Sequence, residues 1–397
     1  MLVLNICILI LVLIFGFNFK NNFKIFNNYD RSILNKLFLY HLLVSLVFYI
    51  IISTQGGDST NYWFLTYDFR FYDFNDVLQV IYRGSATGSM LLINFIPAKI
   101  LHLSFLTGNI IYATLGYIGF VFFYAIAKEN IPHLSYVKSS KILGISIFPF
   151  FLFLPNFHFW SSGISKDTIL FFCIALFVYS LKHFKRRFLG IVISILLSMA
   201  IRPHITLFLL ISFGIASIIE GKMKGYQKVF LFMILIIGFA TIFNYVLSFI
   251  KLESLDIATI ESYTTKKSTG LSAHSGSGVD ISGYPYPLKI LTLIYRPLFF
   301  DSPNLLGFLA SIENLILIIF TVKILLKKPF KAFRKAPVLL KGGLIFFVIG
   351  VCAFALILGN LGIMLRQKNM FMPLFLIFGW WVIYYGMERK NIIESKT

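Results

Sequence analysis

Long apolar runs separated by short polar segments dominate the pattern of this chain. A helix needs about 20 mostly apolar residues to cross a bilayer core of about 30 Å, and such unbroken runs favour helices that are apolar all round. We therefore predict an all-α, polytopic helical membrane protein with about eleven transmembrane helices. The predicted spans are 2–18, 37–53, 107–126, 142–156, 168–181, 188–201, 205–219, 229–250, 304–326, 342–359 and 372–387.

Two stretches depart from this simple pattern. The run 89–103 is short and carries Pro97, Lys99 and His102, so we expect a re-entrant or interfacial helix on the outer face. The stretch 188–219 would be about 48 Å long as one helix, which is long for one span and short for two. Its interruption at Arg202-Pro203-His204 predicts a hairpin of two short helices. The turn would then lie below the outer surface, where irregular backbone must line protein or a water-filled funnel.

The remaining polar segments contain no separate soluble domain. We predict one transmembrane domain over 1–397, with two long outer loops at 54–88 and 251–303. The second loop has a Ser/Gly-rich middle of the kind that forms flexible linkers. The first apolar run has no basic segment before it and no small-residue cleavage site, so we expect a retained span rather than a signal peptide.

Composition supports the membrane assignment. Hydrophobic residues make up 58% of the chain and charged residues 13%, with a mean hydropathy of +0.83. Ordinary globular chains are about 25% charged, so too little polar surface remains to coat a water-soluble body. Cys7, Cys173 and Cys352 all fall inside apolar runs, which indicates buried small hydrophobic residues and neither a disulfide framework nor a metal cluster.

The net charge of +20 reflects the membrane topology of the chain and does not indicate binding to nucleic acid. With the N-terminus outside and the C-terminus in the cytoplasm, the inner segments hold 24 of the 36 basic residues and 5 of the 16 acidic ones. Excess Lys and Arg in cytoplasmic loops is the usual determinant of orientation. The sequence therefore predicts a multi-pass membrane protein whose C-terminus is cytoplasmic, with the lipid bilayer and not nucleic acid as its partner.

The unusual polar residues collect at the outer ends of the predicted spans. Ionisable groups at membrane depth cost about 2.5–3.5 kcal/mol on insertion scales, and they usually face a cavity. Arg and Lys there suit phosphate groups, whereas a carboxylate or His can activate a sugar hydroxyl. We expect Asp58, Asp167 and His204 to be catalytic. The expected substrate-binding residues are Lys166, Arg202, Arg296, Arg366, Tyr62, Trp160 and Glu313.

Simpler interpretations exist for several of these positions. Asp58 follows Gly-Gly and suits a turn, and Asp167 at a helix start favours the helix dipole. Arg202 can extend to the outer headgroups, and Arg296 can pair with a nearby carboxylate. Lys166 is harder to explain in this way, because a cation at a helix N-terminus is unfavourable unless an anion binds there.

Three of these motifs resemble a known family. The outer loop after the second span carries G-D-x-x-x-Y at Gly57, Asp58 and Tyr62, and W-S-S-G-I-S-K-D and R-P-H follow at 160–167 and 202–204. With the expected orientation, they resemble Wzy/EpsG-type bacterial polysaccharide polymerases. The resemblance implies a membrane glycosyltransferase that joins polyprenyl-pyrophosphate-linked oligosaccharide repeat units at the outer leaflet, without a cofactor or metal, to build a surface polysaccharide such as a capsule or O-antigen.

The resemblance also implies partners and leaves alternatives. A polyprenyl-(pyro)phosphate-linked glycan would be the substrate, and other membrane proteins of polysaccharide assembly are further candidate partners. The first alternative is a GT-C-type glycosyltransferase, which adds one sugar from a polyprenyl-phosphate donor and in some cases needs a divalent metal. The second is a lipid or glycan transporter, for which inverted repeats would be typical; broken helices are expected here but no repeat is visible.

Overall fold

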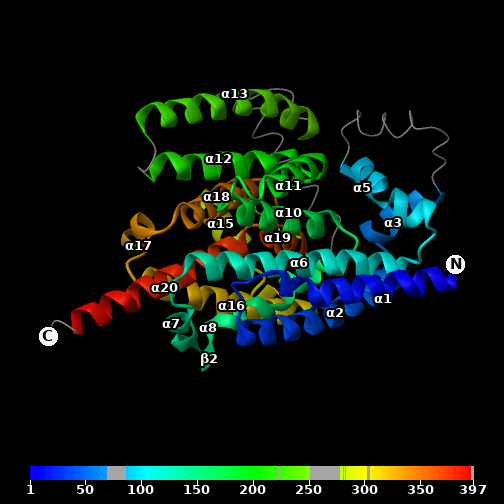
Figure 1. Ribbon diagram of the computed structural model, residues 1–397, viewed down its shortest axis with the longest axis horizontal. Helices are drawn as coiled ribbons and strands as arrows, with labels where there is room; N and C mark the ends of the chain where they lie inside the picture. The colour runs from blue at the N-terminus through cyan, green and yellow to red at the C-terminus, as the bar shows by residue number, and fades with distance from the viewer. Residues whose placement is uncertain are drawn as a thin grey trace. The chain divides into compact units, whose positions relative to one another are not determined.

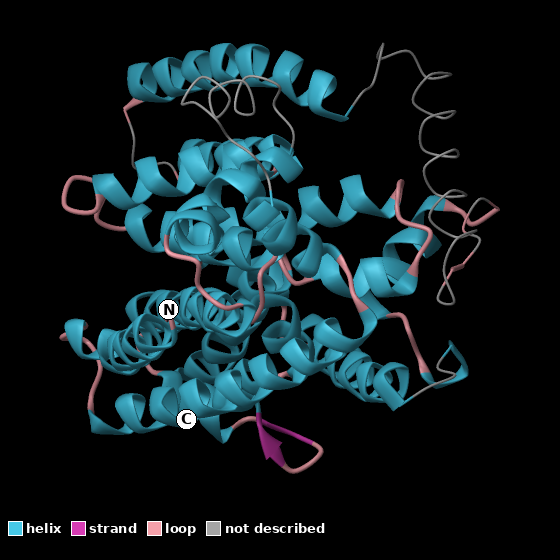
Figure 2. Ribbon diagram, turned by 90° about the vertical axis from the view of Figure 1, so that its right-hand side faces the viewer, coloured by secondary structure: helices cyan, strands magenta, loops and turns pink. Residues whose placement is uncertain are grey.

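The computed structural model describes residues 1–68, 86–220, 224–250, 278–279, 281, 283–301 and 305–394. Helices make up nearly all of the regular structure in these ranges, and a single two-stranded hairpin is present among them (Figure 2). The predicted class, a helical membrane protein, is confirmed. Five of the described helices are long and apolar enough to cross a membrane, or six if a bent pair counts as one span. The predicted count of about eleven spans is not confirmed.

The chain forms two compact units. The first unit comprises residues 1–126 and 157–206, and the second comprises 127–156 and 207–397. We describe each unit separately. The expectation that residues 1–397 form a single transmembrane domain stays a prediction.

Three long helices form the frame of the first unit. α1 (Leu2–Phe19), α2 (Asn28–Gln55) and α6 (Phe105–Asn130) lie side by side (Figure 1). Phe17 of α1 packs edge-on against Phe38 of α2 at 5.7 Å between ring centroids, and Phe38 contacts Tyr117 of α6 at 4.9 Å. The chain reverses through the 3-10 turn η1 (Lys20–Asn22). Asn27 and Asp30 then start α2 with a reciprocal capping box.

The stretches 89–103 and 188–219 form short helices, as expected, whereas the expected position of 89–103 on the outer face stays a prediction. α5 (Ala86–Asn94) continues into the π-helical turn η2 (Phe95–Ile100), and together they rise only about 22 Å, too little to cross a bilayer core. α11 (Phe188–Ile201) and α12 (Pro203–Ile219) are separated by Arg202 alone. The hydroxyls of Ser198 and Thr206 are hydrogen-bonded at 2.7 Å, although a straight helix would hold these positions about 12 Å apart. The chain therefore folds back at Arg202, as predicted.

Close helix packing and buried polar groups mark the centre of the first unit. A methyl group added at Gly116 of α6 would overlap the carbonyl oxygen of Ser161, at the end of α9 (Pro155–Ser161). Two buried imidazoles, those of His41 in α2 and His158 in α9, approach to 2.8 Å between their Nδ1 atoms. The His158 ring also stacks on Phe120 at 4.3 Å. These contacts fix α9 against α2 and α6.

The second unit contains the remaining candidate spans. α16 (Leu305–Leu325) and α18 (Val338–Ala355) are single helices, whereas α19 (Leu361–Lys368) and α20 (Met372–Glu394) form a pair bent by 59°. The short helix α17 (Pro329–Lys335) connects α16 to α18. α13 (Gly225–Ile250) and α15 (Tyr286–Tyr295), with the 3-10 turn η4 (Phe299–Asp301), complete its larger elements.

The predicted span at 142–156 is wrong, because this stretch is not one helix. It follows α7 (Leu134–Ser139) and consists of β1 (Lys141–Ile142), β2 (Ile145–Ser146), α8 (Ile147–Phe150) and the 3-10 turn η3 (Phe151–Phe153). Leu143 and Gly144 form the hairpin turn with positive φ of 48° and 79°. Pro149 lacks the N–H that a continuing helix would need. The apolar run thus fills a compact corner of the second unit with short elements.

The two predicted outer loops are only partly described. Residues 69–85 of the first loop and 251–277 of the second lie outside the described residues. The described part of the first loop is α3 (Asp58–Asp68), together with the start of α5. In the second loop, the Val279 N–H donates to the carbonyl of Gly359 at 2.9 Å and so joins this segment to the start of α19.

Candidate functional site

The start of α10 (Lys166–Leu181) presents Lys166 and Asp167 in the first unit. Ser165 caps this helix, because its hydroxyl accepts a hydrogen bond from the Thr168 N–H at 3.1 Å. The preceding loop is held by α2, where the Ser45 hydroxyl donates to the Ser162 carbonyl at 2.9 Å. The position of the Lys-Asp pair is therefore fixed by buried polar contacts on both sides of the cap.

Arg202 meets Asp167 at this helix start. Its guanidinium Nη1 lies 3.1 Å from the Asp167 carboxylate, and the two side chains are 13% and 3% exposed. Arg202 can reach this position because it is the single non-helical residue between α11 and α12. An Arg and a carboxylate predicted on different spans thus form a half-buried ion pair.

Lys166 contacts residues of α3 and α5. Its ammonium lies 5.0 Å from the ring centroid of Tyr62 in α3, a cation–π distance. It also lies 3.4 Å from the Thr87 hydroxyl of α5. The Ser89 hydroxyl of the same helix donates to the carbonyl of Ala200 at 2.7 Å, beside the break that carries Arg202. Elements α3, α5, α10 and α11 therefore converge on one group of residues, the "Lys166–Arg202 cluster", formed by Lys166, Asp167, Arg202 and Tyr62.

The other residues predicted for this site lie on the same elements or near them. Asp58 is the exposed first residue of α3, one helical turn before Tyr62 and on the same side of the helix. His204 is the second residue of α12 and is half-buried. Trp160 is half-buried in α9, with its ring 5.0 Å from that of Phe159. The structure does not place Trp160 in the Lys166–Arg202 cluster.

The cluster carries two cations and one carboxylate, so its net charge is positive. Such a site favours a phosphate or pyrophosphate, because Arg offers planar paired donors and Lys a point charge. The Tyr62 ring adds an apolar wall at which a sugar or prenyl group can pack. Among the described residues, no three His, Cys, Asp or Glu side chains gather as a metal site would require; the metal-free reaction stays a prediction.

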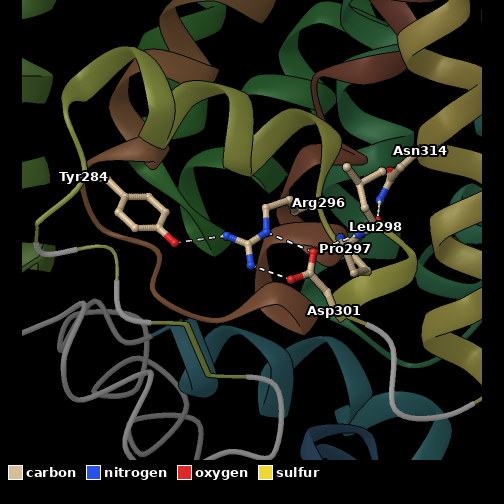
Figure 3. Close-up of polar contacts among 6 residues, drawn as sticks. All are labelled: Tyr284, Arg296, Pro297, Leu298, Asp301 and Asn314. Atoms are coloured by element: carbon tan, nitrogen blue, oxygen red, sulfur yellow. Dashed lines mark hydrogen bonds and ion pairs between the residues drawn. The ribbon is translucent and has the colours of Figure 1, made fainter.

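The guanidinium of Arg296, in the second unit, donates hydrogen bonds to residues of the protein itself. Its Nε donates to Asp301 Oδ2 at 2.9 Å, its Nη2 pairs with the other carboxylate oxygen, and its Nη1 donates to the Tyr284 hydroxyl at 3.3 Å (Figure 3). The hydrogen bonds that Arg296 donates to Asp301 raise the pKa of the Arg296 guanidinium. Burial alone would raise the pKa of the Asp301 carboxyl, but the hydrogen bonds from Arg296 and the Leu298 N–H lower it below its ordinary value.

Arg296 therefore closes a tight loop in this state, the simpler interpretation that the sequence left open. Its role in binding substrate stays a prediction. Asn314 of α16 fixes the same loop from the other side, since its side-chain amide donates to the Pro297 carbonyl at 2.7 Å (Figure 3).

Glu313 lies in a fully buried polar network. One of its carboxylate oxygens, Oε2, accepts a hydrogen bond from the Asn156 N–H at 3.0 Å, and the other is buried without a partner. Lys368, at the end of α19, donates to the Asn314 side chain and to the Ile294 carbonyl. Glu313 is 4% exposed and Lys368 1%, yet within the described chain they form no direct ion pair.

Asparagines complete this network at the bend between α19 and α20. The Asn156 side chain donates to Asn369 Oδ1 at 2.8 Å and to the Leu365 carbonyl at 3.1 Å, and Asn369 donates back to the Asn156 carbonyl at 2.7 Å. Such pairing satisfies backbone groups that the bend releases from helical bonding. The network thus holds together three interruptions, before α9, after α15 and between α19 and α20.

The predicted residues are divided between the two units. Asp58, Tyr62, Trp160, Lys166, Asp167, Arg202 and His204 belong to the first unit, and Arg296, Glu313 and Arg366 to the second. Arg366 is half-buried on α19, two positions before Lys368. Sequence reasoning missed Asn156, Asn314, Lys368 and Asn369 as one network. Polar residues within or beside apolar runs were the signal that could have identified them.

Comparison with known proteins adds no relatives to this description. The chain matches no protein-family model, no curated protein and no solved structure.

Proposed function

We propose that this protein is a membrane glycosyltransferase that polymerises polyprenyl-pyrophosphate-linked oligosaccharide repeat units at the outer leaflet, for a surface polysaccharide. The observation that carries the proposal is the Lys166–Arg202 cluster, in which Arg202 pairs with Asp167 at 3.1 Å and the neighbouring Lys166 lies 5.0 Å from the Tyr62 ring of α3. Burial of an Arg and a carboxylate at predicted membrane depth is costly, so it needs a functional reason. The resemblance of the motifs at Asp58, 160–167 and 202–204 supports the same class.

In this proposal Lys166 and Arg202 bind the pyrophosphate of the donor. The leaving group departs as a polyprenyl pyrophosphate, and its developing negative charge is stabilised by these cations. A base takes the proton of the acceptor sugar hydroxyl as the new glycosidic bond forms at the anomeric carbon of the donor. Asp58, exposed at the start of α3, and His204 are the candidates for this base. Asp167 orients Arg202 through the 3.1 Å contact.

A clean deletion of the gene tests the proposal in cells that make the polysaccharide. We expect single repeat units on the cell surface and no long chains, with long chains restored by the unaltered gene. Normal chain lengths would refute the proposal. One sugar missing from every repeat unit would indicate a GT-C-type transferase, and the loss of activity in EDTA would then distinguish a metal-dependent enzyme of that kind.

Transport is a second candidate, favoured by one specific observation. The span formed by α19 and α20 is broken, the buried Lys368 lies at its break, and the buried Glu313 of α16 belongs to the polar network that reaches the break through Asn156 and Asn369. Broken helices with buried polar groups are typical of transporter sites. The same deletion separates the two functions, because without a transporter the lipid-linked repeat units stay on the cytoplasmic leaflet. Without a polymerase they reach the outer surface singly.

A further inference from the structure

The short helix α17 lies at the end of two candidate spans. Three residues connect it to α16 and two connect it to α18. Each residue extends the chain by at most about 3.5 Å, so α17 remains at the membrane surface where these spans end. The polar and apolar side chains of α17 therefore lie where they can contact the surface of the bilayer.

One side of α17 packs on α20. Ala332 is buried, and its carbonyl accepts a hydrogen bond from Trp381 Nε1 at 2.9 Å. The rings of Phe333 and Phe378 contact each other at 6.2 Å between centroids. These contacts fix the rotation of α17 about its own axis, and hence the direction of its other side chains.

The remaining surface of α17 is basic and aromatic. Lys331, Arg334 and Lys335 are spaced three and four positions apart, which places them on one side of the helix, and all three are exposed. Lys328 is exposed just before the helix. These four side chains make no hydrogen bond or ion pair within the described chain. Phe330, next to them around the helix, is 84% exposed.

We propose that this "α17 basic face", formed by Lys328, Phe330, Lys331, Arg334 and Lys335, binds the headgroups of anionic phospholipids. Clustered Lys and Arg beside a transmembrane helix attract anionic lipids, and an exposed aromatic ring suits insertion at the interface. No acidic residue lies between Glu313 and Glu388 to compete for these cations. The usual excess of Lys and Arg in cytoplasmic loops would account for the basic residues of this loop. It would not account for the exposed Phe330 or for the placement of the basic residues on one side of the helix.

A reporter on α17 tests the proposal with the full-length protein in vesicles. Phe330→Trp places a fluorophore in the face at a position where little packing is lost, and the unaltered protein supplies the background from its four native Trp residues. Vesicles of phosphatidylcholine contain a minor fraction of either brominated phosphatidylglycerol or brominated phosphatidylcholine. We expect the anionic lipid to quench the reporter about twofold more at equal fraction, because the basic cluster enriches it locally.

The matched variants remove equal charge. Lys331→Gln/Arg334→Gln/Lys335→Gln should bring the two lipids to equal quenching. Lys24→Gln/Lys141→Gln/Lys185→Gln, which removes three exposed cations from three separate segments, should preserve the difference. Should the first variant fail to accumulate, salt tests the Phe330→Trp protein alone, since screening shortens the Debye length from about 10 Å at 0.1 M to about 3 Å at 1 M. Equal quenching by the two lipids in the Phe330→Trp protein would overturn the proposal. So would a quenching difference that survives removal of the three α17 charges or survives high salt.

Discussion

The guanidinium of Arg202 lies 3.1 Å from the carboxylate of Asp167, and this contact joins the α11–α12 break to the start of α10. Because Asp167 is 3% exposed, it would be a costly isolated charge without this partner. The pair therefore has a structural role whatever else it does. A test of function at Arg202 must separate that role from substrate binding.

Arg202→Lys makes the first separation. Lys keeps the charge but loses the planar fork that suits pyrophosphate. We expect long-chain glycan to fall about tenfold or more, which needs only about 1.4 kcal/mol of lost transition-state binding. Protein in the membrane should accumulate as before. Normal glycan in this variant would mean that a point charge suffices and that Arg202 does not bind pyrophosphate bidentately.

The charge exchange Arg202→Asp/Asp167→Arg makes the second separation. If the pair only stabilises the fold, the exchange restores both accumulation and chain length relative to either single variant. If Arg202 also binds the donor, accumulation recovers and polymerisation does not. Immunoblots of membranes and gels of surface glycan give the two readouts.

Asp58→Asn distinguishes a base from a turn residue. Asp58 is exposed at the start of α3, and Asn suits such positions as well as Asp does, so the fold should be unaffected. We expect loss of polymer if the carboxylate takes the proton of the acceptor hydroxyl. Asn61→Asp, on the same helix, is the control for altered charge near the site. Unchanged chain length in Asp58→Asn would leave His204 as the candidate base.

Glu313 and Lys368 should depend on each other for stability. They form no direct ion pair, but both are buried in one network, so the removal of one leaves the other less compensated, by less than the about 3–5 kcal/mol typical of a contacting buried pair. We expect Lys368→Met and Glu313→Gln each to lower the unfolding temperature of the purified protein. The double variant should lower the unfolding temperature by less than the sum of the two single decreases. Additive losses would show that the two groups do not interact despite their common network.

Some of these features could be predicted from the sequence and others could not. Arg202-Pro203 interrupts a stretch that is too long for one span, so the break there was visible in the pattern. The hairpin at Leu143-Gly144 was not, because an apolar run does not distinguish one long helix from several short elements. Lys166 and Arg202 could be predicted at the outer ends of spans from their cost in a membrane. Asn156 and Asn369 could each be noticed as polar residues beside apolar runs, but no local pattern shows that these two distant residues contact each other.

Arg296 and Asp301 should make the loop between α15 and α16 sensitive to acid. The folded-state pKa of Asp301 is lowered, so the stabilisation is complete above the ordinary carboxyl pKa of about 3.9 and is lost as the pH falls through the lowered value. We expect protection of residues 296–301 from hydrogen exchange to be constant near neutral pH and to fall in strong acid. Asp301→Asn should remove this pH dependence and lower protection at neutral pH.

Orientation can be tested by labelling single cysteines in intact cells. After replacement of Cys7, Cys173 and Cys352, Ser277→Cys in the second outer loop should react with a membrane-impermeant maleimide. Ser139→Cys, at the exposed last residue of α7, should react only after the cells are permeabilised. The basis is the excess of basic residues on the predicted inner side. The opposite labelling pattern would place the Lys166–Arg202 cluster at the cytoplasmic face, away from an outer-leaflet substrate.

Gly116 shows how far a single methyl group can act in this molecule. Its missing side chain leaves room for the Ser161 carbonyl, four positions before the cap that starts α10. An alanine there would push this loop away from α6, and the displacement would be transmitted to Lys166 and Asp167 without touching either of them. The positions of Lys166 and Asp167 therefore depend partly on the absence of a Cβ atom at Gly116. A substitution at Gly116, remote from any ligand, can thus have the same effect as the loss of a binding residue.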